Sequence, residues 1–179
     1  MHLLRSTAIG TEVIDNTNHD VHGKVASLVI DPDRGKLIAL LIISSASSDL
    51  LSLQTDDIVT WGNRIHIRDT DILGPVQEVV RLQEYLTSKR TVIGQRIKTK
   101  SGTYIGKCCD VQFRTDTFDV EWIFPRRFFR KGLALPTSDI LEIKDSGIII
   151  KDQKPKGEEV VSKASETETE LKTAVSPVT

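Results

Sequence analysis

Aromatic and basic side chains are concentrated in one short stretch of the sequence, residues 122–131. The members that we assign to a candidate binding surface are Trp122, Arg126, Arg127, Phe128, Phe129, Arg130 and Lys131. Arginine and aromatic residues are enriched at the energetic centres of protein interfaces. The same types bind single-stranded RNA, because rings stack on bases and cations pair with phosphates. A structural interpretation also stands, in which Trp122 and Phe124 are core residues covered by arginine stems.

Two adjacent cysteines, Cys108 and Cys109, are the only thiols in the chain. On a strand their side chains point to opposite faces, so we expect one in the core and one outside. A catalytic thiol needs a nearby base, and residues 92–151 contain no histidine. The carboxylate pair Asp56 and Asp57 precedes a predicted strand, where capping a turn is favoured over acid–base chemistry. We therefore predict no catalytic residues.

Histidine and aspartate side chains share one polar turn near the N-terminus, where His19 and His22 stand beside Asp15 and Asp20. This spacing is compatible with metal ligation. The later copy of the same segment, described below, carries no histidine, and such loop clusters are commonly solvated. We predict neither a metal site nor a cofactor.

Composition indicates a folded chain of one or two domains: 179 residues, 39% hydrophobic and 27% charged. The net charge of -1 gives no global attraction to nucleic acid or anionic membranes, although residues 89–131 hold 11 basic and 4 acidic side chains. No apolar run approaches the ~20 residues that span a bilayer. Adjacent cysteines do not form a disulfide framework, so we expect a reducing cytoplasm.

The elements that position these residues come from an internal repeat. Residues 9–13, Ile-Gly-Thr-Glu-Val, recur as residues 93–97, Ile-Gly-Gln-Arg-Ile, and residues 51–59 recur as 133–141. Both copies read as short strands, with insertions and deletions confined to loops. A repeat of this length predicts one small all-β unit duplicated, over residues 5–70 and 92–151.

Two further segments differ in character from the repeats. Apolar residues spaced for one face of a helix follow Gly74 and Pro75, so residues 71–91 are predicted to form a linker helix with Pro75 at its first position. Residues 152–179 contain no aromatics and are rich in Ser, Thr, Glu and Lys. They are predicted to form a disordered C-terminal tail.

The repeat resembles the PRC-barrel domain family over roughly residues 5–151. The resemblance is carried by Gly10, by Gly23-Lys24-Val25, by the hairpin Asp31 to Leu37, by the apolar strand after it, and by Leu53 to Ile58. The second copy keeps Gly94, Gly102, Gly106 and Leu135 to Ile140, although Thr115 to Phe118 stands where the hairpin glycine belongs. The resemblance implies two tandem small antiparallel β-barrels.

Members of this family include the cytoplasmic domain of the photosynthetic reaction-centre H subunit, the C-terminal half of a bacterial 16S rRNA maturation factor, and small prokaryotic proteins. The resemblance therefore implies a non-catalytic adaptor or assembly module that binds a protein partner. The alternative is a ribosome-associated or rRNA-associated factor that uses the basic-aromatic stretch of the second copy. Self-association and peripheral association with a membrane complex, without a spanning segment, are further expectations.

Overall fold

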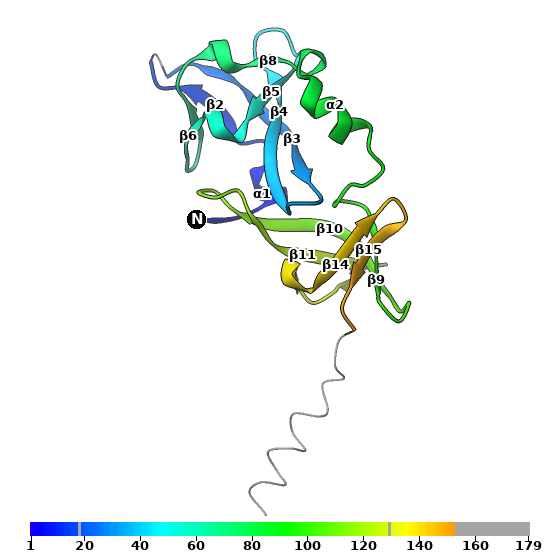
Figure 1. Ribbon diagram of the computed structural model, residues 1–179. Helices are drawn as coiled ribbons and strands as arrows, with labels where there is room; N and C mark the ends of the chain where they lie inside the picture. Colours follow the sequence, from blue (N-terminus) through cyan, green and yellow to red (C-terminus); the bar gives the residue numbers. More distant parts are fainter. Residues whose placement is uncertain (18, 129, 153–179) are drawn as a thin grey trace, which may run out of the picture.

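A computed structural model describes residues 1–17, 19–128 and 130–152, with the side chains of Arg130 and Lys131 not described. The predicted tail lies outside the described residues from position 153 onward. The fold is mostly β, with two sheets that stand one above the other in Figure 1 and a short helix, α2, beside the first. The prediction of an all-β protein is confirmed at this level.

The first sheet has seven strands in the order β6-β7-β2-β3-β4-β5-β8. The strands are β2 (Glu12–Asp15), β3 (Val21–Asp31), β4 (Lys36–Ser44), β5 (Leu50–Gln54), β6 (Ile58–Trp61), β7 (Ile65–Ile67) and β8 (Gly74–Pro75). The most apolar strand, β4, lies inside the sheet between β3 and β5, as its composition predicts. The turn before it is ordered by Asp31, whose carboxylate accepts hydrogen bonds from the backbone N–H groups of Asp33 and Arg34.

The second sheet follows the path β12-β11-β10-β9-β15-β14. Its strands are β9 (Arg96–Thr99), β10 (Tyr104–Arg114), β11 (Val120–Arg127), β12 (Arg130–Lys131), β13 (Leu135–Pro136), β14 (Ile140–Lys144) and β15 (Gly147–Ile150). Strand β13 pairs with β11, and the N-terminal strand β1 (His2–Leu4) pairs with β10. The N-terminal residues therefore belong to the second sheet, and the short helix α1 (Arg5–Ala8) leads from it to the first.

The two sheets repeat one connectivity, as the sequence repeat predicts. Strands β2, β3, β4, β6 and β7 correspond to β9, β10, β11, β14 and β15, and the 3-10 turns η1 (Thr55–Asp57) and η4 (Thr137–Asp139) also correspond. The sequence predicts purely antiparallel pairing, and this prediction is wrong. The first and last strands of each unit, β2 with β7 and β9 with β15, run parallel. Parallel neighbours need a long connection, which the rest of the unit supplies. The described pairings close neither sheet into a barrel.

The linker is less helical than predicted. It contains the 3-10 turn η2 (Thr70–Ile72), strand β8, the 3-10 turn η3 (Val76–Glu78) and helix α2 (Val80–Thr87). Pro75, expected at the first helical position, is instead extended and pairs with Leu51 of β5. Helix α2 packs Leu82 and Tyr85 against the first sheet, at Val29 and Leu41. No helix in the described ranges has the length and hydrophobicity to cross a bilayer.

One hydrophobic core runs through both units. Leu40 and Ile65 of the first sheet belong to the same buried cluster as Ile97, Phe113 and Ile148 of the second. The hairpins of the two units also join through their backbones. Leu37 N–H donates to the Phe118 carbonyl at 2.8 Å, and Val120 N–H donates to the Gly35 carbonyl at 2.9 Å. The two copies are therefore packed together as one body.

Candidate binding surface

Three basic residues form a row across the second sheet, perpendicular to its strands. Arg96 of β9 is opposite Lys107 of β10, and Lys107 is opposite Arg126 of β11. Directly opposed residues of neighbouring strands point to the same face of a sheet. We call Arg96, Lys107 and Arg126 the cation row. With strands about 4.8 Å apart, the row places one cation on each of three successive strands.

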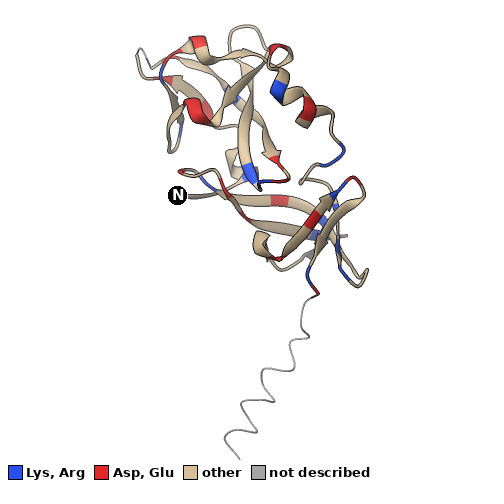
Figure 2. Cartoon of the chain, in the orientation of Figure 1, with Lys and Arg blue, Asp and Glu red and all other residues tan. Residues whose placement is uncertain are grey.

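The side chains of Arg96, Lys107 and Arg126 are exposed, whereas their neighbours Ile97 and Cys108 are buried. This alternation follows from the two-residue period of a strand, which turns successive side chains to opposite faces. Blue segments, which mark Lys and Arg in Figure 2, lie on the side of the second unit where Figure 1 labels β9 and β15. The cation row therefore lies on the solvent side of the sheet, directly above the core.

The charges of the cation row are not neutralised within the described part of the chain. Arg96, Lys107 and Arg126 take part in none of its ion pairs. Asp110, the acidic residue further along β10, accepts hydrogen bonds from the Ser6 N–H at 3.1 Å and the Ser6 hydroxyl at 2.5 Å. Like charges placed directly opposite each other destabilise a sheet. An anionic partner on this face would relieve that repulsion.

The first unit carries a balanced version of the same row. The register pairs Glu12 with Lys24 and Lys24 with Ile43, at the positions that correspond to Arg96, Lys107 and Arg126. Glu12 Oε1 lies 3.7 Å from Lys24 Nζ, and Glu12 Oε2 lies 3.1 Å from Arg64 Nε. The duplicated fold therefore does not require the excess positive charge, which is specific to the second unit.

The β11–β12 hairpin projects an aromatic side chain beside the cation row. Phe128 follows Arg127, the last residue of β11. Phe128 has a φ of 52° and is 85% exposed. Positive φ is rare for a bulky residue. Phe129 and the side chains of Arg130 and Lys131, also predicted for this surface, lie outside the described set.

A second aromatic residue, Tyr104, lies on β10, three residues before Lys107. The Arg127 guanidinium carbon is 6.0 Å from the centre of the Tyr104 ring, which is cation–π geometry. A shallow groove of about 390 Å³ lies beside Tyr104 and Phe128. It is lined by Ile93, Gly94, Tyr104, Lys107, Cys108, Cys109, Arg126 and Phe128.

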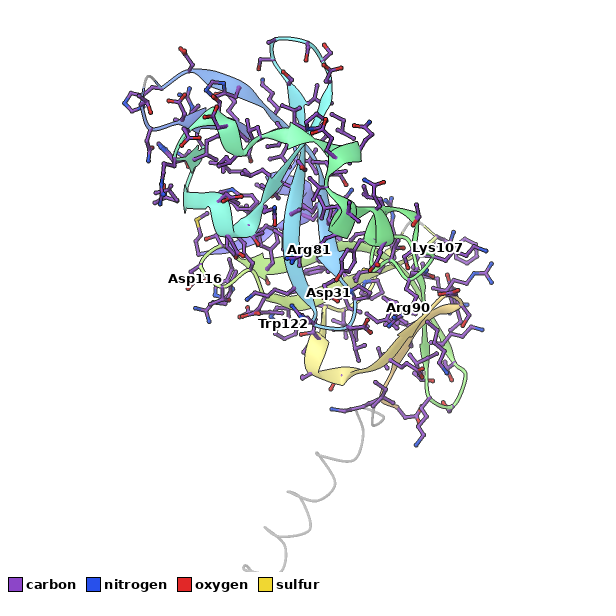
Figure 3. The ribbon with its side chains drawn as sticks, turned by 45° about the horizontal axis from the view of Figure 1, so that its top comes forward. Asp31, Arg81, Arg90, Lys107, Asp116 and Trp122 are labelled. Atoms are coloured by element: carbon purple, nitrogen blue, oxygen red, sulfur yellow. The ribbon has the colours of Figure 1, made fainter. Side chains whose placement is uncertain are left out.

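Trp122, the first residue of the predicted surface, lies further along β11. It is opposite Gln112 of β10 and Pro136 of β13 and is 37% exposed, so the interpretation of Trp122 as a core residue is wrong. Lys107 and Trp122 are well separated in Figure 3. The structure thus brings Arg126, Arg127 and Phe128 together and leaves Trp122 apart from them.

Sequence reasoning missed Arg96, Tyr104 and Lys107. They are far from residues 122–131 along the chain, and only the strand register brings them beside Arg126. A usable signal was nevertheless present in the repeat, since Arg96 stands where the first copy has Glu12. A charge reversal between two otherwise matching copies points to a difference in function.

The other candidate residues lie in the first unit and on β10. His22 Nε2 is 2.8 Å from Asp15 Oδ2, while His19 is exposed. Among the residues with described coordinates, no three His, Cys, Asp or Glu side chains are grouped to hold a metal ion. Cys108 is buried and Cys109 half-buried, as predicted. Burial raises the pKa of the Cys108 thiol to about 12, which keeps it protonated and unreactive at neutral pH.

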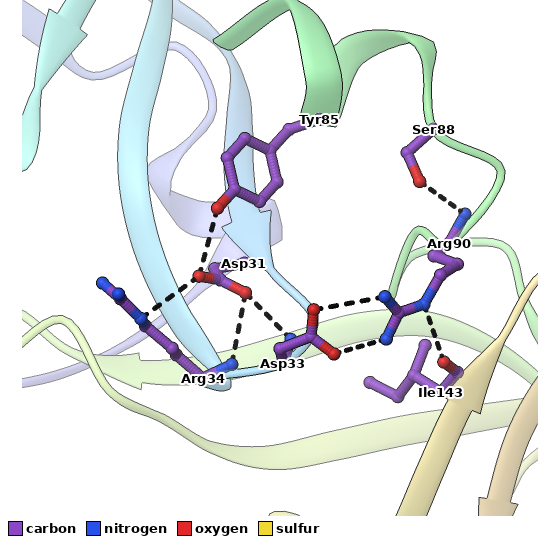
Figure 4. Close-up of polar contacts among 7 residues, drawn as sticks. All are labelled: Asp31, Asp33, Arg34, Tyr85, Ser88, Arg90 and Ile143. Atoms are coloured by element: carbon purple, nitrogen blue, oxygen red, sulfur yellow. Dashed lines mark hydrogen bonds and ion pairs between the residues drawn. The ribbon is translucent and has the colours of Figure 1, made fainter. Parts of the chain in front are cut away.

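A polar network joins the linker to both units (Figure 4). Arg90 donates two hydrogen bonds to the Asp33 carboxylate of the first unit, and its Nε donates to the Ile143 carbonyl of the second at 3.0 Å. The Tyr85 hydroxyl donates to Asp31 at 3.2 Å. The hydrogen bonds from Arg90 lower the pKa of the Asp33 carboxyl. Each of these polar groups has a hydrogen-bond partner, so we interpret the network as one that holds the linker and the two units together.

No protein-family model and no curated protein matches the chain. Function is therefore inferred from the surface itself.

Proposed function

We propose that the protein is a non-enzymatic adaptor or assembly module, built from two PRC-barrel-like units, whose second unit docks a protein partner. One observation carries the proposal. Arg96, Lys107 and Arg126 of the second unit are exposed and form no ion pair with any described residue, whereas Glu12 neutralises the corresponding row of the first. A row of directly opposed like charges that the duplicated fold does not require is best explained by a partner that covers it.

The PRC-barrel part of the proposal is supported by two corresponding glycines. A Cβ atom at Gly23 would lie 2.4 Å from the carbonyl oxygen of Ile43, and one at Gly106 would lie 2.8 Å from that of Arg126. Both glycines therefore let the long hairpin strands of their unit approach closely. These are among the positions through which the sequence resembles the family.

A second candidate function, association with RNA or the ribosome, is favoured by one specific observation. Tyr104 and Phe128 present partly or fully exposed rings next to Lys107 and Arg126. Single-stranded RNA uses both features, because its phosphates pair with cations and its bases stack on rings. The experiment that tests the main proposal must therefore distinguish a protein partner from an RNA partner.

The test is affinity purification of the intact protein from its native cells, with and without nuclease. The variant Lys107→Ala/Arg126→Ala removes two charges of the cation row, and Lys24→Ala is the matched change in the first unit. We expect a protein to be retained by the wild type and by Lys24→Ala, with or without nuclease, and to be lost from the double variant. Retention that disappears with nuclease would favour RNA. Retention of a copy of the chain itself, seen as a dimer by light scattering, would identify self-association.

A further inference from the structure

The Phe128 side chain, which directly follows β11, contributes little to the fold. The Phe128 ring is 85% exposed and so buries little apolar surface. Its φ of 52° is a conformation in which glycine or asparagine is favoured. A large apolar side chain at such a position costs free energy in the isolated protein. Local strain of this kind is concentrated at functional sites.

Two positively charged side chains, Lys107 and Arg126, line the same groove as this ring. Arg126 and Arg127 precede Phe128 on β11. Protein interfaces commonly have an apolar or aromatic anchor at the centre and a polar rim around it. Phe128, with Lys107 and Arg126 beside it, has an aromatic centre and a charged rim. A complementary partner would carry an apolar pocket with an acidic rim.

The surroundings of Tyr104 favour a folded protein over a nucleic acid as the partner. A single-stranded nucleic acid stacks successive bases on a series of open rings along a basic track. Here the guanidinium of Arg127 lies over the Tyr104 ring at 6.0 Å. Only Phe128 is left as a fully open ring among the described residues of this surface, and it stands at a turn.

We propose that Phe128 is the anchor of the docking surface and that it inserts into an apolar pocket, rimmed by Asp and Glu side chains, on a folded protein partner. This inference rests on the proposed function and deepens it by naming the chemistry of the partner. The exposed ring fills the pocket, and Lys107 and Arg126, which line the same groove, pair with the acidic rim. Charge complementarity of this kind accelerates association and sets orientation.

The test uses the full chain in its native cells, with a photo-crosslinking benzoyl-phenylalanine in place of Phe128. The crosslinked site on the partner is mapped by mass spectrometry. Partner retention is then compared for Phe128→Ser, Phe128→Leu and Arg126→Glu. Val80→Ser is the control, because Val80 is an apolar residue of similar exposure, 79%, on helix α2. Far-UV circular dichroism checks that each variant is folded.

We expect Phe128→Ser and Arg126→Glu to reduce retention about tenfold or more, the loss typical of an anchor residue. Phe128→Leu and Val80→Ser should retain the partner, and the crosslinked peptide should lie beside Asp or Glu residues. Equal retention by Phe128→Ser and the wild type would overturn the inference while leaving the adaptor function standing. A crosslink to RNA would overturn it as well. If the wild type retains no protein at all, the adaptor function fails together with the inference.

Discussion

The rings of Trp61 and Phe113 lie 5.3 Å apart, centre to centre, and are inclined by 55°. Trp61 ends β6 of the first unit, and Phe113 lies in β10 of the second. Tilted aromatic pairs at this distance are favourable beyond the area that they bury. The pair lies in a core that both units share, so neither unit buries its apolar face alone.

Replacing Phe113 by Ala should therefore destabilise the whole chain. Phe113 is 1% exposed, and removing a buried Phe typically costs about 3–5 kcal/mol. Urea unfolding followed by tryptophan fluorescence and circular dichroism should show one shared transition, shifted to lower urea. Leu133→Ala, at a residue 67% exposed, should shift the urea midpoint only slightly, as substitutions of surface residues usually do. Two separate transitions in the wild type would contradict a shared core.

The ion pair between Asp33 and Arg90 should make stability depend on pH. The hydrogen bonds from Arg90 lower the pKa of Asp33, so the ionised carboxylate stabilises the folded state. This contribution is present above the ordinary pKa of an aspartate and is lost as the pH falls through the lowered value.

Between about pH 6 and pH 2, the melting temperature of Asp33→Asn should consequently fall less than that of the wild type. Arg90→Ala should flatten the profile in the same direction, because it removes the group that lowers the pKa. Asp116, whose pKa is also lowered through Arg114, is present in every variant and cancels from the comparison. Identical profiles for all three proteins would show that the ion pair contributes nothing.

The two cysteines should differ in reactivity. Cys108 is fully buried with a pKa raised to about 12, whereas Cys109 is half-buried. Titration with a thiol reagent at about pH 8 should modify one thiol in the native protein and both after denaturation. Peptide mapping should identify Cys109 as the residue that reacts in the native protein. Prompt modification of Cys108 in the native protein would show that its strand opens readily.

Gly23 should not tolerate a side chain. A Cβ atom there would lie 2.4 Å from the backbone oxygen of Ile43, which cannot move without disturbing the β3–β4 pairing. Gly23→Ala should cost about 1–3 kcal/mol, as overpacking does. Gly62→Ala is the control, because nothing lies within 4 Å of its added atom. A comparison of thermal midpoints decides the outcome, and equal effects of the two changes would rule out close strand approach as the reason for Gly23.

The cation row should cost the free protein stability. Arg126→Ile introduces the residue type that the first unit has at the corresponding position, Ile43, and removes one charge from three opposed cations. We expect the melting temperature at low salt to stay equal or rise, because like-charge repulsion decreases. The difference from the wild type should shrink as salt screens the charges. A clear loss of stability at low salt would mean that Arg126 serves the fold rather than a partner.

Much of the fold could be predicted from residue patterns. The duplication, the turn at Asp31, the interior position of β4 and the opposite burial of Cys108 and Cys109 all follow from local periodicity and turn chemistry. The linker was predicted less well, because Pro75 satisfies the rules for a helix start and for an edge strand equally. Its pairing with Leu51 depends on a sheet edge that local patterns do not describe.

The sequence by itself determined that the chain consists of two copies of one β unit, and that basic and aromatic residues are concentrated in the second. Both features are local and are carried by spacing and composition. Only the tertiary structure decided which residues share a surface. Strand register placed Arg96 and Lys107 in line with Arg126, and the shared core packed the two units into one body. Register and packing between distant strands depend on long-range contacts, which short-range patterns do not encode.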